Sequence, residues 1–370
     1  MEKINSTQEY VETQKETHID IESARQHLDN APNQYFEAIN KYSEEEFLNF
    51  VKKLEPIINF LKNPHSIASV GVGGGLELRV LYELFKEKHT EIIGVDLSKK
   101  ALSSARKYLT EHNVRALLVQ SSAVEMPFKY TNDYMDGIVL SAIMHEIYSY
   151  VEDGKIAWIK AIQEASMTLS NNGVLLLRDF AGPEINDLIE ISFLDQDVKD
   201  FYSYFRERFR TFDTWNKDEV EKMKDKRNKQ DDYPILSEGQ ASVIMPFGTA
   251  AELMLHYRNY VSDFKNGTII SFANDWKEID ERYLIPDPDS DAFCPMSPEK
   301  YKEKILFHAN DKLKQSGYKF ECVKSEITAR PDTVNEIKKY FSIKHKNKTQ
   351  EELLGQITSK MELVFKKITN

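Results

Sequence analysis

The most constraining feature of this 370-residue sequence is the stretch IASVGVGGG, residues 67–75. It begins as a short apolar run, which is typical of a buried parallel strand. Three glycines follow at alternate positions, Gly71, Gly73 and Gly75, and lead into LELRVLYELF, whose apolar residues recur at helical spacing. A strand, a glycine turn and a helix form a nucleotide-binding corner, because glycines let the backbone approach a ligand and the helix start offers free N–H groups.

The spacing of the glycines narrows the choice of ligand. A dinucleotide fingerprint requires G-x-G-x-x-G, whereas the third glycine here is Gly75 and residue 76 is leucine. A second apolar stretch, EIIGVDLS, carries Asp96 near its end. An acid at the end of a second strand can accept hydrogen bonds from both ribose hydroxyls of a nucleoside. The two stretches together predict a nucleoside-containing cofactor.

Three further stretches, taken with this corner, resemble the class I S-adenosylmethionine (SAM)-dependent methyltransferases. They are SSAVEMPF, DYMDGIVLSAIMHEI and LSNNGVLLLRDF, and they resemble the family's loop after strand three and its fourth and fifth strands. The resemblance spans about residues 65–182 and implies a Rossmann-like, doubly wound α/β fold. Such a fold has a mostly parallel seven-stranded sheet with an antiparallel last strand. The resemblance also implies SAM as the cofactor, bound by Gly71, Gly73, Gly75, Asp96, Leu97, Ser122, Ala123 and Ser141.

Two positions depart from the family's pattern. Ser69 stands where family members usually carry an acid near the methionine ammonium, and Ser122 stands where an Asp often meets the adenine amino group. Each change removes a charge-assisted hydrogen bond. The departures predict weaker SAM binding than is usual, or a different bound nucleoside.

The rest of the chain is expected to build around this core. Residues 1–64 predict an N-terminal helical layer or lid, and the core comprises residues 65–182 and 298–348, closed by an antiparallel pair, YKFECVKSEIT and KKYFSIKHK. A large insertion after strand five, residues 183–297, predicts a mainly helical cap over the substrate. Residues 349–370 predict an amphipathic C-terminal helix.

Composition limits the partners and the compartment. Hydrophobic residues make up 41% and charged residues 29%, and the net charge of −11 disfavours nucleic acid as a partner. No apolar run approaches ~18 residues, so no membrane span is expected. The two cysteines, Cys294 and Cys322, fit the reducing cytoplasm. Asp287, Asp289 and Asp291 alternate as in a calcium loop, but the loop's glycine and terminal glutamate are missing, so no metal is expected.

Candidate catalytic residues follow the fourth predicted strand. His145, Glu146 and Tyr148 supply an imidazole, a carboxylate and a phenol. Methyl transfer mainly requires the nucleophile to be held in line, about 3–3.5 Å from the methyl carbon. A base is needed only when the nucleophile arrives protonated. His145 is therefore either that base or a structural residue that is hydrogen-bonded behind the cofactor.

The main prediction is a SAM-dependent methyltransferase that acts on a small molecule or a protein side chain; the oligomeric state stays open. Two alternatives belong to other classes. A SAM- or nucleoside-binding protein without methyl transfer is favoured by Ser69 and Ser122. A nicotinamide-dependent reductase is allowed by Asp96, but the glycine spacing opposes it and no second dinucleotide half follows.

Overall fold

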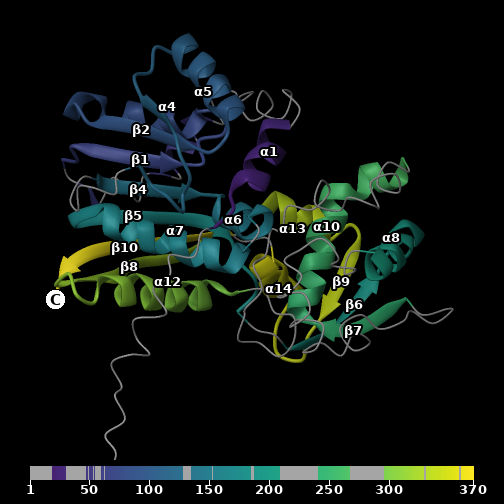
Figure 1. The fold of residues 1–370 in the computed structure, drawn as a ribbon. Helices are drawn as coiled ribbons and strands as arrows, with labels where there is room; N and C mark the ends of the chain where they lie inside the picture. Colours follow the sequence, from purple (N-terminus) through teal and green to yellow (C-terminus); the bar gives the residue numbers. More distant parts are fainter. Residues whose placement is uncertain are drawn as a thin grey trace, which may run out of the picture.

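Two β-sheets organise the chain in the computed structural model (Figure 1). The structure describes residues 19–30, 47–48, 50–52, 54, 60–61, 63–127, 135–151, 153–184, 187–208, 241–266, 296–328, 331–357 and 360–370. Within these residues, one sheet has seven strands and the other has three.

The large sheet has the strand order β3-β2-β1-β4-β5-β10-β8. Its strands are β1 (Ser66–Val70), β2 (Glu91–Asp96), β3 (Leu117–Gln120), β4 (Met135–Ser141), β5 (Leu169–Phe180), β8 (Tyr318–Thr328) and β10 (Lys360–Thr369). β10 runs antiparallel to both of its neighbours, whereas β1 to β5 pair in parallel. The predicted fold class, a mostly parallel seven-stranded sheet whose last strand is antiparallel, is confirmed.

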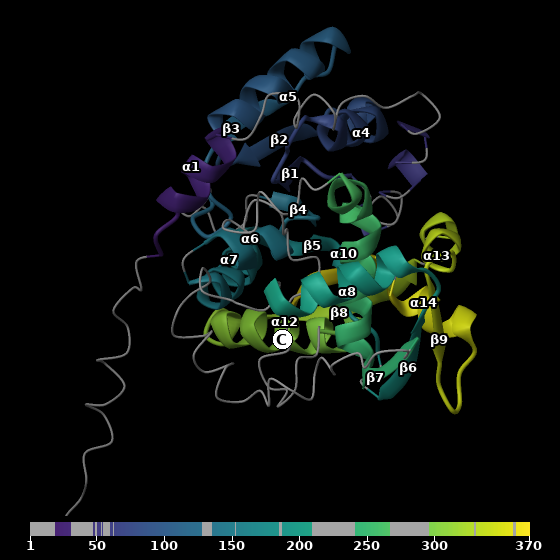
Figure 2. The ribbon, with the colours of Figure 1, turned by 90° about the vertical axis from the view of Figure 1, so that its right-hand side faces the viewer.

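Helices cover both faces of this sheet, as right-handed crossovers between parallel strands require. The helix α4 (Leu76–Phe85), which leads into the short helix η1 (Lys86–Lys88), and the helix α5 (Lys99–Glu111) pack on one face. The other face carries α6 (Met144–Tyr150), α7 (Gly154–Thr168) and α12 (Pro298–Leu313). Figure 2 shows α4 and α7 on opposite sides of the strands.

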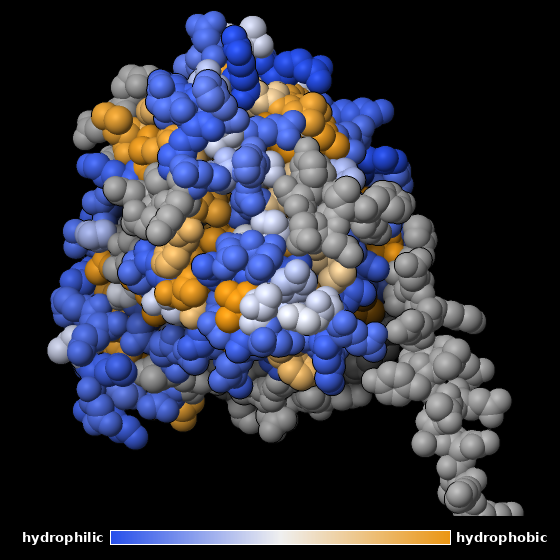
Figure 3. Space-filling view, turned by 90° about the vertical axis from the view of Figure 1, so that its left-hand side faces the viewer, coloured by the Kyte–Doolittle hydropathy of each residue, from blue (hydrophilic) through white to orange (hydrophobic). Residues whose placement is uncertain are grey.

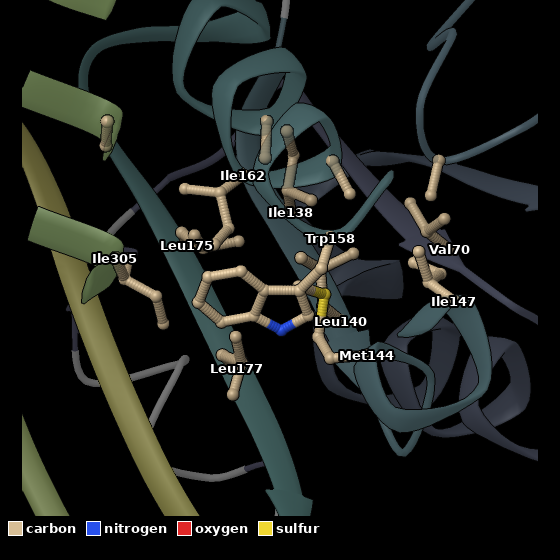
Figure 4. Close-up of a cluster of buried hydrophobic side chains, with 14 of the residues drawn as sticks. Val70, Ile138, Leu140, Met144, Ile147, Trp158, Ile162, Leu175, Leu177 and Ile305 are labelled. Carbon is tan, nitrogen blue, oxygen red and sulfur yellow. The ribbon is translucent and has the colours of Figure 1, made fainter. Parts of the chain in front are cut away.

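Trp158 lies at the centre of the core on the α7 side. Its indole packs among Leu177 of β5, Ile305 of α12 and Met144 of α6 (Figure 4), and only 4% of the residue is exposed. A large aromatic ring that joins three helices and the sheet contributes strongly to stability, because it buries a large apolar area.

The N-terminal segment contributes helix α1 (Glu22–Asn30), which contacts α5 and α6 near the carboxyl ends of the strands (Figure 1). Phe47, Leu54 and Leu61 pack with the core on the α4 side of the sheet. The N-terminal segment therefore touches both helical layers.

The prediction of a C-terminal helix over residues 349–370 is wrong. A short helix, α14 (Gln350–Ile357), is followed by the strand β10, which inserts between β5 and β8. Met361 and Phe365 fit a helical stripe, but Leu363 and Val364 are also buried, one on each face of the sheet. A strand buried on both faces gives a continuous apolar run, which periodicity cannot distinguish from a buried helix.

The insertion is not mainly helical, and it is not built from residues 183–297 alone. A smaller sheet with the order β7-β6-β9 lies at its centre, and all its pairings are antiparallel. This subdomain comprises β6 (Leu188–Phe193), α8 (Gln196–Arg208), β7 (Ser242–Pro246), α10 (Phe247–Lys265), α13 (Pro331–Ile337), β9 (Phe341–Lys344) and α14. The stretch KKYFSIKHK, predicted to close the large sheet, instead supplies β9.

The route of the chain explains this correction. The chain leaves the large sheet after β5 and again after β8, and returns through α12 and β10. Both excursions begin at the carboxyl edge of the sheet, so their strands meet there, and Figure 1 shows the subdomain beyond that edge. The aromatic residues Phe201 and Phe205 of α8 lie in its core with Tyr257. The subdomain is thus a second small core at the end where ligands of such sheets bind.

The opposite edge of the large sheet is mostly hydrophilic, with hydrophobic residues in small separate patches (Figure 3).

Among the helices that the structure describes, none has the length and apolar character needed to cross a membrane. No group of three or more His, Cys, Asp or Glu side chains in the described residues could hold a metal ion. Asp287, Asp289 and Asp291 lie outside the described residues.

Candidate active site

The glycine turn between β1 and α4 has a backbone that only glycine adopts easily. Gly71, Gly73 and Gly75 have φ angles of 77°, 49° and 98°, all in the left-handed region. The Gly71 N–H donates to the carbonyl oxygen of Val95 at 2.8 Å, which ties the turn to β2. A Cβ atom on Gly71 would meet the Ile143 side chain at 2.7 Å. The turn is therefore held tightly between β2 and the loop after β4.

We expect Gly75→Ala to lower the free energy of unfolding by about 1–3 kcal/mol, because its backbone angle disfavours a side chain. An added Cβ would also lie 3.1 Å from Ala105 of α5. The matched control is Gly355→Ala in α14, where a Cβ meets nothing within 4 Å and a helical alanine is favourable by up to ~1 kcal/mol. Urea denaturation measures both variants. Equal effects at the two positions would contradict the account of the turn.

Asp96 at the end of β2 is the acidic group of the cofactor corner. Its Oδ2 accepts a hydrogen bond from the Gly73 N–H at 3.2 Å, and its Oδ1 accepts one from the Ser98 N–H at 2.9 Å. Burial raises the pKa of Asp96 to about 6, and the carboxylate of Asp29 adds to this rise. A carboxylate that binds the turn's own amide is placed to accept further hydrogen bonds from a ligand seated on the turn.

Asp29, at the end of α1, is a residue of this region that sequence reasoning missed. Its Oδ1 accepts a hydrogen bond from the Ser98 hydroxyl at 2.7 Å. Ser98 also caps α5, since its side chain accepts from the N–H groups of Lys100 and Ala101. Nothing in the sequence pattern links Asp29 to Ser98, because the two residues meet only through tertiary packing.

The raised pKa of Asp96 predicts opposite pH dependences of stability and of SAM affinity. Because the folded carboxyl group binds its proton more tightly than the unfolded one, its protonation stabilises the apo fold. That stabilisation is complete below the ordinary value of 3.8 and is lost as the pH rises through about 6. The ionised form is the one that we expect to accept both ribose hydroxyls, so SAM affinity should fall as the pH drops through the same window.

Calorimetry at about pH 7.5 and about pH 5 should show roughly tenfold weaker SAM binding at the lower pH, since about a tenth of Asp96 stays ionised there. Asp96→Asn is the control, because it binds SAM weakly and without this pH dependence. A pH dependence that persists in Asp96→Asn would assign the titration to another group.

The loop after β3 lies beside Asp96. The Ser121 N–H donates to the Asp96 carbonyl oxygen at 3.1 Å, and the Leu97 carbonyl oxygen accepts from the Gln120 side chain at 3.2 Å. Ser122 is buried, and its hydroxyl accepts from the Val124 N–H at 3.3 Å. The structure thus places Leu97, Ser122 and Ala123 at the end of β2, while their contacts with a cofactor remain a prediction.

The end of β4 adjoins the glycine turn. Val70 of β1 pairs with Leu140 of β4, so Gly71 and Ser141 leave neighbouring strands at the same level. The Ser141 hydroxyl accepts a hydrogen bond from Arg178 Nη1 at 3.4 Å. The next residue, Ala142, has a φ angle of 56°, which costs a non-glycine residue energy and is frequent at functional sites. The predicted cofactor residues therefore gather along one edge of the sheet.

His145 lies in the first turn of α6 and is held by Asp179 of β5. Its Nδ1 is 2.7 Å from Asp179 Oδ1, and its backbone N–H donates to Oδ2 at 3.0 Å. His145 is 3% exposed and Asp179 is fully buried. The Phe180 ring meets the imidazole edge-on, with ring centroids 5.3 Å apart. The imidazole is therefore fixed in one orientation.

Sequence reasoning missed Asp179 as a partner of His145. The signal was a charged residue at the end of an otherwise apolar strand, in the sequence Leu-Arg-Asp-Phe. Such a buried charge requires a partner, but the sequence does not say which residue provides it.

The other two candidate catalytic residues differ in their surroundings. Tyr148 lies three residues after His145 on α6 and is 7% exposed, whereas Glu146 is only partly buried. Burial raises the pKa of Tyr301 of α12 well above its usual value, with contributions from Asp179 and Tyr148. His145, Tyr148, Asp179 and Tyr301 are thus all buried, whereas Glu146 is more exposed.

Comparison with known proteins agrees with this geometry. Residues 67–173 match the family described as Methyltransferase domain. No curated protein matches the chain.

Among solved structures, the chain is similar to the 1,6-didemethyltoxoflavin-N1-methyltransferase of Burkholderia thailandensis at 10% identity and a TM-score of 0.43, covering 100% of this chain and 93% of that one. It is similar to a SAM-dependent methyltransferase of Methanosarcina mazei at 12% identity and a TM-score of 0.40, covering 85% and 98%. A SAM-dependent methyltransferase of Aquifex aeolicus is 16% identical, with a TM-score of 0.34, covering 41% and 74%.

The family match and the strand order define the class of protein. Residues 67–173 are a methyltransferase domain, and the seven-stranded sheet with one antiparallel strand is the class I fold. Residues 67–173 therefore carry the methyltransferase domain that the sequence predicted.

The residues at the sheet edge fit SAM. Asp96 offers carboxylate oxygens that suit ribose hydroxyls, and the left-handed glycine turn leaves backbone rather than side chains at the end of β1. When bound, SAM supplies a methyl group on a positively charged sulfur. The chain must hold the acceptor in line with that group and, where the acceptor is protonated, take up its proton.

Proposed function

We propose that the protein methylates a small molecule through a hydroxyl or amine group, and that His145 accepts the proton. The observation that carries the proposal is the buried contact between His145 Nδ1 and Asp179 Oδ1, at 2.7 Å, directly after β4. Tyr148 and Glu146 are proposed to orient the acceptor from the same helix.

The contact with Asp179 suits His145 to the role of a base. A carboxylate accepts hydrogen bonds, so this contact favours the proton on Nδ1 and makes Nε2 the proton-accepting nitrogen. Asp179 also stabilises the imidazolium that forms when Nε2 takes a proton. The backbone hydrogen bond from His145 to Asp179 fixes the ring relative to β5.

Burial of this pair supports a small acceptor. His145 is 3% exposed, so an acceptor that reaches it must be enclosed by the protein. A small molecule can be enclosed in this way, whereas a side chain on a folded protein cannot easily be. The subdomain beyond the carboxyl edge (Figure 1) lies where it can cover such an acceptor and exclude water.

We also propose that the protein acts in the cytoplasm. Cys322 is a free cysteine whose thiol donates to the Lys324 carbonyl oxygen at 3.2 Å. A free cysteine fits a reducing compartment. Reporter fusions with fractionation test this, and recovery from an oxidising compartment would contradict it.

Isotope transfer tests the proposed acceptor class. The purified protein is incubated with SAM carrying a deuterated methyl group and with either the small-molecule or the protein fraction of a cell extract. We expect a labelled product only in the small-molecule fraction, as detected by mass spectrometry. Label in the protein fraction alone would overturn the small-molecule acceptor. A sample without enzyme controls for chemical methylation.

A further inference from the structure

We propose that Glu77 binds the α-ammonium group of SAM. The inference rests on SAM as the cosubstrate and assigns a residue to its amino-acid half. The sequence has Ser69 where an acid is expected, so a carboxylate for this group must come from elsewhere in the chain. Glu77 is the acid that the structure places beside Ser69.

Glu77 lies in the first turn of α4, two residues after Gly75. Its Oε1 accepts a hydrogen bond from the Ser69 hydroxyl at 2.5 Å. Ser69 is fully buried and precedes the last residue of β1. An acid in the first turn of a helix is also favoured by the helix dipole. The carboxylate is therefore held against the end of β1 by both its helix and its strand.

The charge of Glu77 is not matched by a cation of its own. Burial raises its pKa, while the hydroxyls of Ser69 and Ser141 and the charge of Arg178 act in the other direction. Arg178 itself pairs with Glu362, with Nε 3.1 Å from Oε1. Within the described part of the chain, no lysine or arginine forms a salt bridge with Glu77. A cationic group of a ligand would therefore be stabilised here by a charge-assisted hydrogen bond.

The position of Glu77 matches the shape of SAM. Asp96 ends β2, and Glu77 is hydrogen-bonded to Ser69 near the end of the neighbouring strand β1. Gly73, which donates to Asp96, lies in the turn that leads into α4. Neighbouring strands lie about 5 Å apart, a separation that the methionyl chain can span from the ribose. SAM carries one primary ammonium group beyond its ribose, so Asp96 and Glu77 together recognise the two ends of that span.

Calorimetry with three ligands tests the assignment. S-adenosylhomocysteine carries the ammonium and the carboxylate, its decarboxylated analogue keeps only the ammonium, and methylthioadenosine has neither group. For Glu77→Gln we expect about ten- to hundredfold weaker binding of the first two ligands and unchanged binding of methylthioadenosine. Glu83→Gln, in the last turn of α4 where Glu83 pairs with Lys86, is the matched control and should bind all three ligands like the unmodified protein.

A second variant moves the carboxylate. Ser69→Asp combined with Glu77→Gln should recover part of the lost affinity for S-adenosylhomocysteine. Unchanged affinity of Glu77→Gln for S-adenosylhomocysteine would overturn the proposal, because it would show that Glu77 makes no contact with the ammonium group. An equal loss of affinity for methylthioadenosine would also overturn it, because it would show a general loss of structure. If the unmodified protein binds none of the three ligands, SAM itself is the wrong cosubstrate, which is a different outcome.

Discussion

His145→Ala is expected to lower kcat by about 10²–10⁴-fold, because a positioned base contributes that much to a reaction that releases a proton. SAM affinity should change little, since the described cofactor corner does not include the imidazole. Steady-state kinetics with the acceptor found by isotope transfer, together with calorimetry for SAM, separates the two effects. His89→Ala, beyond the end of α4, is the control histidine variant and should keep full activity.

Asp179→Asn distinguishes a base from a structural histidine. The amide cannot stabilise an imidazolium, so kcat should fall and the pH profile of kcat should lose the ionisation of His145. A purely structural role predicts lower stability with an unchanged pH profile in both variants. Full activity in folded His145→Ala would remove the base from the proposed mechanism.

Trp158→Ala is expected to lower the free energy of unfolding by about 3–5 kcal/mol, since it leaves a large cavity in a core that cannot fully collapse. Trp158 is 4% exposed and touches elements from both the sheet and the helices around it (Figure 4). Phe307→Ala on α12 is the matched control, because Phe307 is 67% exposed and such a change should stay within about 0.5 kcal/mol.

Urea denaturation at one pH measures the free energy of unfolding of both variants, Trp158→Ala and Phe307→Ala. A loss in Trp158→Ala no larger than that in Phe307→Ala would mean that the α7 side of the sheet is not packed as described. Because Trp158 lies close to Met144 of α6 (Figure 4), the same variant should also lower activity.

The sequence by itself determined the cofactor half of the protein. Gly71, Gly73 and Gly75 each require left-handed backbone, and Asp96 follows an apolar strand within a short distance. These features depend on the conformation of a few neighbouring residues, so they can be recognised without knowing which parts of the chain meet. The first two parallel strands were predictable for the same reason, since each is a short apolar run between turn signals. The fourth and fifth strands were predicted from the family resemblance.

The tertiary structure alone decided the elements whose partners are distant in the chain. β10 was predicted as a helix because its run of apolar residues fits either element until the gap between β5 and β8 is known. β9 was assigned to the wrong sheet, because an alternating strand does not specify its neighbour.

The same reason limits what could be predicted of the site. The contact between His145 and Asp179, and the hydrogen bond from Ser69 to Glu77, join side chains on different elements. Local sequence shows that a buried charge needs a partner, but only the packing of β4 and β5, or of β1 and α4, selects that partner. The sequence thus predicted the glycine turn as a cofactor site, and the tertiary structure decided which charged groups surround it.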